Sequence, residues 1–102
     1  MTLTQLRHFI GLAQAGSFIK ASSQLCMTQP ALSRSIKSLE DELGELLFDR
    51  SGKRTELTPF GRATLQRSQA LIDEAEALKS SGNKLDATDS GRVRLGDRKS
   101  VV

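Results

Sequence analysis

Two amphipathic helical patterns follow each other between residues 17 and 44, with Cys26 and Met27 as the link between them. The first pattern begins after Ser17, which offers a hydroxyl N-cap. Its apolar residues recur at spacings of three and four, and they are Phe18, Ala21 and Leu25. A link this short permits only a tight corner, so the segment predicts a helix-turn-helix.

The second pattern predicts a helix from Gln29 to Leu43. Thr28 offers a hydroxyl N-cap, and Gly44 supplies a C-terminal stop signal. At about 100° per residue, the apolar residues of this helix form one narrow stripe. They are Leu32, Ile36, Leu39 and Leu43. We expect this stripe to face the core of the domain.

The opposite face of the second helix is polar and basic, and no acid occurs between Thr28 and Lys37. Arginine and lysine suit phosphates and guanine edges, glutamine pairs with adenine, and a proline ring packs against a thymine methyl group. The N-terminal half of this helix is therefore a candidate for reading DNA, through Thr28, Gln29, Pro30, Ser33, Arg34 and Lys37. The alternative is an ordinary solvated face, because many amphipathic helices carry two or three cations.

The end of the second helix is acidic instead. Glu40, Asp41 and Glu42 would repel a phosphate backbone, so we expect this end to point away from DNA or to pair with nearby bases. Lys37 and Asp41 are one turn apart. A solvated helix end explains the acidic run better than a general acid and base pair does.

A third helix is expected upstream, where Thr2 and Gln5 have the spacing of a capping box and Gly16 closes the pattern. Its apolar residues are Leu3, Leu6, Phe9, Ile10 and Ala13. The three helices would share one core.

Downstream, two extended runs at residues 46–50 and 55–58 flank a turn that contains Gly52, which predicts a β-hairpin. The hairpin carries Arg50 at its base and Lys53 and Arg54 at its tip. A charged hairpin tip is usually just solvated. After a helix-turn-helix, however, such a hairpin is a wing whose basic tip can lie along phosphates or enter a narrow minor groove.

Thr58 and Pro59 form a start signal for a long helix that should continue to about Lys84. About 24 residues would span roughly 36 Å, and the apolar face exceeds what a small domain can cover. Its members are Leu65, Leu71, Ile72, Ala75 and Leu78. We expect these residues to form a dimer interface; the alternative is a helix that packs within its own chain. Two-fold pairing would place two reading helices on one face of DNA, so the operator should be an inverted repeat with half-sites about one helical turn apart.

Residues 3–67 resemble the N-terminal DNA-binding domain of LysR-type transcriptional regulators. The matching pieces include Leu6-Arg7-His8-Phe9, Gly16-Ser17-Phe18, Thr28-Gln29-Pro30-Ala31-Leu32-Ser33-Arg34, Leu47-Phe48-Asp49-Arg50 and Leu57-Thr58-Pro59-Phe60-Gly61. The resemblance implies a mainly α fold, a three-helix winged helix-turn-helix with a two-stranded β wing, followed by a long linker helix used for dimerisation. It also implies a phosphate contact from Lys20. Ser22, Ser23 and Phe60 depart from the usual family pattern, which affects local packing and not the class.

Three regions are expected: a DNA-binding domain at 1–58, the linker and dimerisation helix at 59–85, and a hinge with the start of an effector domain or a disordered tail at 86–102. Residues 92–96 alternate polar and apolar like a first strand. In the resembled family the effector-sensing domain starts here, so the chain is expected to be a DNA-binding portion. A small-molecule effector would act only through a domain absent from this chain, and the complete protein would be a homodimer or a tetramer. The residues after Gly96 have no assignment.

The composition agrees with a DNA-binding domain but does not establish one. The formal net charge is +3, so the placement of the charges carries the argument. A single cysteine excludes an internal disulfide and suits a reducing cytoplasm, and we expect Cys26 to be a buried small hydrophobe instead of a redox switch. No stretch approaches the ~20 apolar residues of a membrane span.

The sequence offers no catalytic residues, metal ligands or cofactor motif. His8 is the only histidine and has no partner at metal-ligand spacing, so a place on or half beneath a helix surface is expected for it. Two functions remain: a sequence-specific dimeric DNA-binding regulator, and a winged-helix module used for protein interaction. The acid-free basic faces favour the regulator, because an interaction face would more often expose aromatics and all four phenylalanines are placed for the core.

Overall fold

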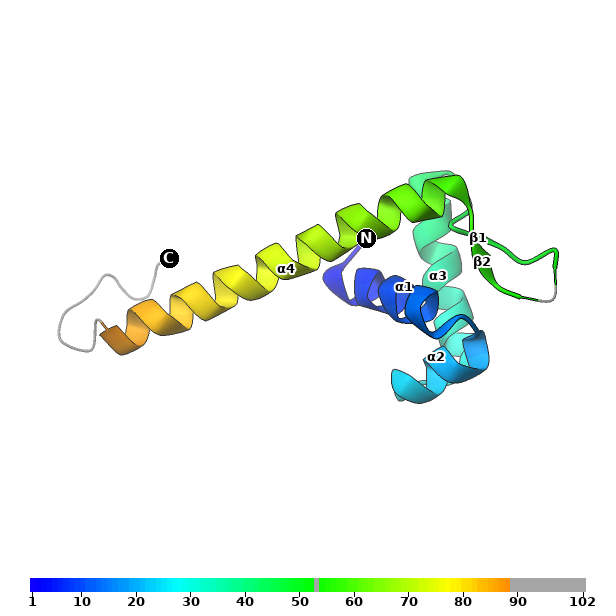
Figure 1. Ribbon diagram of the computed structural model, residues 1–102. Helices are drawn as coiled ribbons and strands as arrows, with labels where there is room; N and C mark the ends of the chain where they lie inside the picture. The colour runs from blue at the N-terminus through cyan, green and yellow to red at the C-terminus, as the bar shows by residue number, and fades with distance from the viewer. Residues whose placement is uncertain (53, 89–102) are drawn as a thin grey trace. The chain divides into compact units, whose positions relative to one another are not determined.

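The structure is a computed structural model that describes residues 1–52 and 54–88. Six elements follow one another: α1 (Leu3–Ala15), α2 (Phe18–Gln24), α3 (Gln29–Leu43), β1 (Phe48–Asp49), β2 (Glu56–Leu57) and α4 (Pro59–Thr88) (Figure 1). The chain divides into a compact unit of Met1–Ile72, which we call the head, and a second unit that begins at Asp73. The predicted fold class, mainly α with a two-stranded wing and a long helix, is confirmed.

The three helices of the head begin where the hydroxyl caps predicted, and α1 and α3 end where Gly16 and Gly44 predicted. The Thr2 hydroxyl accepts from the backbone N–H of Gln5, whose side chain accepts from the backbone N–H of Thr2 in return. Ser17 and Thr28 cap α2 and α3 in the same hydroxyl-to-backbone manner. Gly16 and Gly44 end α1 and α3 in the left-handed backbone conformation, each with a φ of 80°, which glycine adopts without steric cost.

The corner between α2 and α3 is as short as predicted, but Cys26 corrects one expectation. Its thiol is exposed and not buried. The reason is local, because Cys26 has a φ of 57° and its backbone N–H turns back to the carbonyl oxygen of Ser23. This reversal directs the cysteine to solvent, while Met27 packs against the edge of the core.

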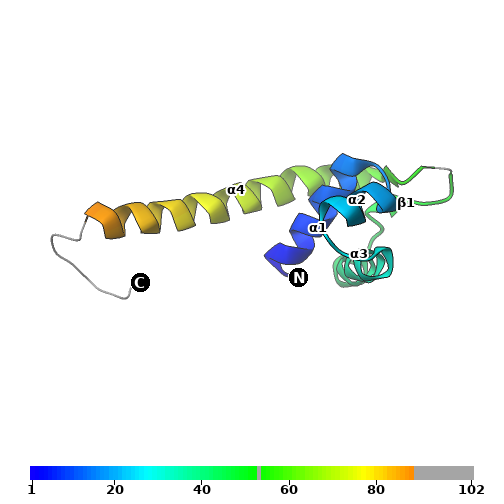
Figure 2. The same ribbon diagram turned by 90° about the horizontal axis from the view of Figure 1, so that it is seen from below.

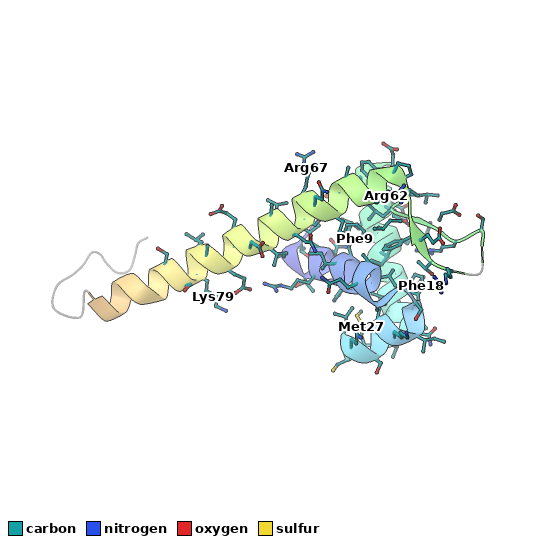
Figure 3. The ribbon with its side chains drawn as sticks, viewed as in Figure 1. Phe9, Phe18, Met27, Arg62, Arg67 and Lys79 are labelled. Carbon is teal, nitrogen blue, oxygen red and sulfur yellow. The ribbon has the colours of Figure 1, made fainter. Side chains whose placement is uncertain are left out.

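The core of the head lies where α1, α2 and α3 meet, with the start of the wing against them (Figures 1 and 2). Its buried apolar members are Leu6, Phe9, Leu12, Ala21, Leu32, Ile36, Leu39, Leu47 and Phe48. The rings of Phe9 and Phe48 are 5.5 Å apart and nearly perpendicular, so the wing and α1 share an edge-to-face aromatic contact. Figure 3 shows Phe9 within this part of the head.

The hairpin is antiparallel, with Phe48 opposite Leu57 and Asp49 opposite Glu56. Each strand is only two residues long, shorter than the extended runs at 46–50 and 55–58 predicted. Residues 50–52, 54 and 55, which lie between the strands, form no further ladder.

Helix α4 starts as predicted and ends later than predicted. The Thr58 hydroxyl accepts from the backbone N–H of Gly61 and donates to the carbonyl oxygen of Leu46, which ties the helix start to the segment before β1. The helix continues to Thr88, so 86–88, expected to belong to a hinge, are helical. Helical backbone tolerates aspartate and threonine at such positions at modest cost. The strand predicted at 92–96 lies outside the described residues.

Candidate nucleic-acid interface

The N-terminal half of α3 carries the exposed polar face that the sequence predicted. Gln29, Pro30, Arg34 and Lys37 are exposed and Ser33 is half-buried, whereas Leu32, Ile36 and Leu39 on the other side are fully buried. Thr28 is also exposed, and its hydroxyl is occupied by the N–H of Ala31. The N-terminal half of α3 therefore presents a polar face to solvent and an apolar face to the core. We call the polar face, Gln29, Pro30, Ser33, Arg34 and Lys37, the ridge.

A surface hollow lies at the start of this ridge. It is lined by Phe18, Gln29, Pro30 and Ser33. Phe18 comes from the first turn of α2 and is half-buried, so an aromatic ring borders the same hollow as an amide, a proline ring and a hydroxyl. The prediction that placed Phe18 in the core is thus only partly right. The sequence held a signal for this partial exposure, because Phe18 is the first residue of α2 and no preceding helical turn covers its side chain.

Further along α3, the two cations differ in their surroundings. Lys37 forms an ion pair with Asp41 at 3.8 Å, as the one-turn spacing predicted. Both side chains are about 70% exposed, so this pair contributes little to stability and leaves the ammonium group accessible. Arg34 is exposed on the same face.

Glu40 corrects the expectation of a solvated acidic helix end. Its side chain is 6% exposed, and its Oε2 accepts hydrogen bonds from the backbone N–H groups of Leu47 and Phe48 at 2.8 and 3.3 Å. Asp41 and Glu42 are exposed, as expected. A signal existed in the sequence, because Glu40 follows Leu32 and Ile36 at spacings of eight and four and so lies at the edge of the buried stripe.

Arg50, expected as a DNA contact, is engaged within the head. Its guanidinium lies 3.8 Å from Oε1 of Glu40 and its Cζ is 4.9 Å from the centre of the Phe18 ring. Figure 3 shows Phe18 on the side of the head from which the hairpin projects.

The wing tip presents Arg54, which is exposed, whereas Lys53 lies outside the described residues. Asp49 shapes the start of the turn, since its Oδ1 accepts from both the backbone N–H and the hydroxyl of Ser51. These two hydrogen bonds, the hydroxyl one first, lower the pKa of Asp49 below its ordinary value. Lys20 is exposed on α2.

The residues expected at a dimer interface fall into two groups. Leu65 and Ile72 are half-buried and pack against the core of the head, so part of the predicted apolar face is already covered. Leu71 is 51% exposed and Leu78 is 74% exposed, and Ala75 is half-buried. The residues still open to a partner are therefore chiefly Leu71 and Leu78.

Among the described residues, no group of three histidine, cysteine, aspartate or glutamate side chains is arranged to hold a metal ion. His8 is half-buried on α1, and its Nδ1 lies 2.7 Å from the hydroxyl of Ser35 on α3. None of the helices in the described part of the chain is both long and apolar enough to span a bilayer.

Three helices on one core, a short basic hairpin and an exposed polar ridge on the third helix define a winged helix-turn-helix protein of the DNA-binding class. The family model of bacterial regulatory helix-turn-helix proteins of the lysR family matches residues 3–62. The chain belongs to this family of DNA-binding transcriptional regulators.

Curated relatives agree with this assignment. Over 94 residues the chain is 46% identical to the SDS degradation transcriptional activation protein of a Pseudomonas strain, which covers 92% of this chain and 31% of that protein. It is 33% identical over 96 residues to the transcriptional regulator BenM of Acinetobacter baylyi, covering 94% of this chain and 31% of BenM. The chain thus spans about a third of the length of these relatives.

Solved structures give the same result. The DNA-binding domain of BenM in complex with benA site 1 DNA matches with a TM-score of 0.81 and 35% identity, over 83% of this chain and 99% of that one. Full-length OxyR C199D from Pseudomonas aeruginosa matches with a TM-score of 0.78 and 38% identity, over 82% of this chain and 28% of that one.

Proposed function

We propose that this chain binds an operator as a homodimer, with the N-terminal half of α3 in the major groove and the wing on the backbone or in the minor groove. Gln29, Pro30, Ser33 and Arg34 would read bases, and Lys37 and Arg54 would contact phosphates. Thr28, Lys20 and Lys53 are proposed as further backbone contacts. The observation that carries the proposal is the exposed polar face of α3 opposite an apolar stripe in which Leu32, Ile36 and Leu39 are fully buried.

Charge supports this orientation. The reading half of α3 holds Arg34 and Lys37 and no acid, and Glu40, further along the same helix, is buried in the head, where it pairs with Arg50. A phosphate backbone approaching the hollow would therefore meet cations and neutral polar groups. Comparison with BenM supports DNA binding, since its DNA-binding domain, which has a matching fold, has been solved in complex with benA site 1 DNA.

A dimer is proposed because Leu71 and Leu78 are exposed on α4. A two-fold pair would present two copies of α3 to the same face of DNA, so the operator should be an inverted repeat with half-sites about one helical turn apart.

The experiment that tests this function is selection of bound duplexes from a random pool by the purified chain, followed by affinity measurement as salt rises. We expect an inverted repeat to be enriched. If each protomer neutralises about three phosphates, log K should fall against log[salt] with a slope of roughly −5 for the dimer. No enriched sequence together with a flat salt response would instead favour a protein-interaction module.

A further inference from the structure

The side chain of Arg50 touches two other elements of the head. Its NH2 group lies 3.8 Å from Oε1 of Glu40 on α3, and its Cζ lies 4.9 Å from the ring centre of Phe18 on α2. Arg50 itself directly follows β1. One guanidinium therefore connects the base of the wing to both helices of the helix-turn-helix.

The carboxylate that holds Arg50 is itself fixed. Glu40 is almost fully buried, and its Oε2 accepts from the backbone N–H groups of Leu47 and Phe48, which leaves Oε1 for Arg50. The two backbone bonds anchor the segment that leads from α3 into β1. The Glu40 side chain is thus a rigid base for the guanidinium.

Phe18 extends these contacts to the candidate reading surface. The guanidinium of Arg50 lies over its ring, and Phe18 also lines the hollow together with Gln29, Pro30 and Ser33. Ser33 and Glu40 are seven residues apart on α3, about two turns, so they lie on the same edge of the helix. A shift of Arg50 would therefore move a wall of the hollow and the base of the wing together.

We propose that Arg50 is a positioning residue for base reading, which holds the Phe18 wall of the hollow and the wing base in register with α3, and that it does not itself contact phosphates. This inference rests on the proposed function. A planar guanidinium suits the task because it stacks on an aromatic ring while it pairs with a carboxylate, and a lysine ammonium cannot do both in the same way.

The burial of Glu40 argues against a phosphate contact from Arg50. If the guanidinium left to reach DNA, the carboxylate would stay almost fully buried without its cation, which is strongly unfavourable. Arg54 is exposed at the wing tip and is therefore the appropriate comparison for a phosphate-contacting arginine.

The test uses the full chain, its selected duplex, and duplexes with single base changes in one half-site. Dissociation constants are measured over a range of NaCl concentrations for the wild type, Arg50→Ala, Arg50→Lys, Glu40→Gln and Arg54→Ala. Arg67 is an exposed residue of α4, and Arg67→Ala is the control for the loss of one positive charge. Urea unfolding of each variant shows that the head is folded.

We expect Arg50→Ala and Arg50→Lys to lower the discrimination between selected and changed duplexes by about fivefold or more. This is less than the loss of one whole base contact, because 1.4 kcal/mol of discrimination corresponds to about tenfold in affinity. Their salt slopes should stay at the wild-type value. Arg54→Ala should instead keep its discrimination and make the slope shallower by about 1.8, or 0.9 for each protomer.

Glu40→Gln is the matched variant, because an amide oxygen can accept the same two backbone N–H bonds while the amide N–H₂ faces Arg50 and breaks the pair. It should lose discrimination as Arg50→Lys does. Tighter binding with a steeper slope would mean that the freed Arg50 is a phosphate contact, and would overturn the inference. A shallower slope with intact discrimination in Arg50→Ala would overturn it as well.

The proposed function and the positioning role of Arg50 can be disproved separately. A wild-type chain that bound every duplex alike would overturn the proposed function and this inference with it. A wild-type preference that Arg50→Lys and Glu40→Gln both left unchanged would overturn the inference alone.

Discussion

At the residue scale, the same residue types do different work according to burial. Glu40 and Glu45 lie five residues apart near the end of α3, yet the first is enclosed with two backbone donors and an arginine and the second is exposed. Arg50 and Arg54 are both exposed on the hairpin, but Arg50 pairs with Glu40 and lies over the ring of Phe18, whereas Arg54 is at the wing tip. Charge counted along the sequence treats these pairs alike, so only the contacts separate a structural group from one that is free to meet DNA.

Gln29 should be a reading residue if the hollow at the start of α3 meets base edges. Gln29→Ala should cost about 1–3 kcal/mol of binding free energy on the selected duplex and relax base preference, because an amide can pair with adenine in two places. Gln66→Ala, an exposed glutamine of α4, is the control and should bind as the wild type does. Fluorescence anisotropy on matched and changed duplexes measures both effects. Unchanged preference in Gln29→Ala would show that another element reads the bases.

Asp49 should titrate abnormally at the base of the wing turn. Its pKa is lowered by hydrogen bonds from the hydroxyl and the backbone N–H of Ser51. A lowered folded-state pKa contributes stability that is present above the unfolded value of about 3.9 and is lost as pH falls through the folded value. Ser51→Ala should raise the pKa of Asp49 toward its ordinary value, as followed by carboxyl NMR titration. An identical titration curve in Ser51→Ala would contradict this account of the turn.

At the element scale, the start of α4 fits so closely against the wing that one position tolerates no side chain. A Cβ added at Gly61 would lie 2.1 Å from the carbonyl oxygen of Leu47, which is backbone and cannot swing aside. The Thr58 hydroxyl bonds on both sides of this contact, to Gly61 and to Leu46. The join between wing and helix is therefore set by backbone contacts as well as by apolar packing.

Gly61→Ala should consequently lower the free energy of unfolding by about 3 kcal/mol, the upper part of the range for overpacking. Gly82→Ala is the matched control, because it is also a helical glycine and nothing lies within 4 Å of the added Cβ. There the change should be neutral or stabilising by up to about 1 kcal/mol, through helix propensity. Urea unfolding measures both, and equal effects of the two substitutions would contradict the predicted clash.

At the scale of the whole molecule, α4 has more apolar surface than its own chain covers. Leu65 and Ile72 are used within the head, whereas Leu71 and Leu78 are exposed in the described part of the chain. Large apolar side chains that are left exposed on one helix are typical of a surface completed by a partner. A second copy of the chain would cover them in the proposed dimer.

Leu78→Glu should therefore weaken self-association, because burying a carboxylate in an apolar interface is costly. Ser80→Glu is the control, since two residues along a helix turn the added charge about 200° away from Leu78. Sedimentation velocity should show monomers for Leu78→Glu and dimers for Ser80→Glu at the same concentration. Dimers in both variants would place the interface elsewhere.

The sequence by itself determined the helices, their caps and the order of the elements. These follow from local physics: a hydroxyl at Thr28 satisfies a free backbone N–H, glycine at Gly44 accepts a left-handed φ, and apolar spacing chooses the buried side. The polar ridge of α3 followed for the same reason, because the face opposite a buried stripe must be exposed.

Only the tertiary structure decided which side chains that are distant in sequence contact one another. Whether Glu40 and Arg50 meet solvent or each other depends on how the chain turns between α3 and β1, and the nine residues between them have no periodic pattern that predicts this turn. The exposure of Cys26 and the division of the α4 leucines depend in the same way on a backbone reversal and on which neighbours come to rest against each residue. Local preferences set the elements, and packing between elements sets which polar groups remain free for DNA.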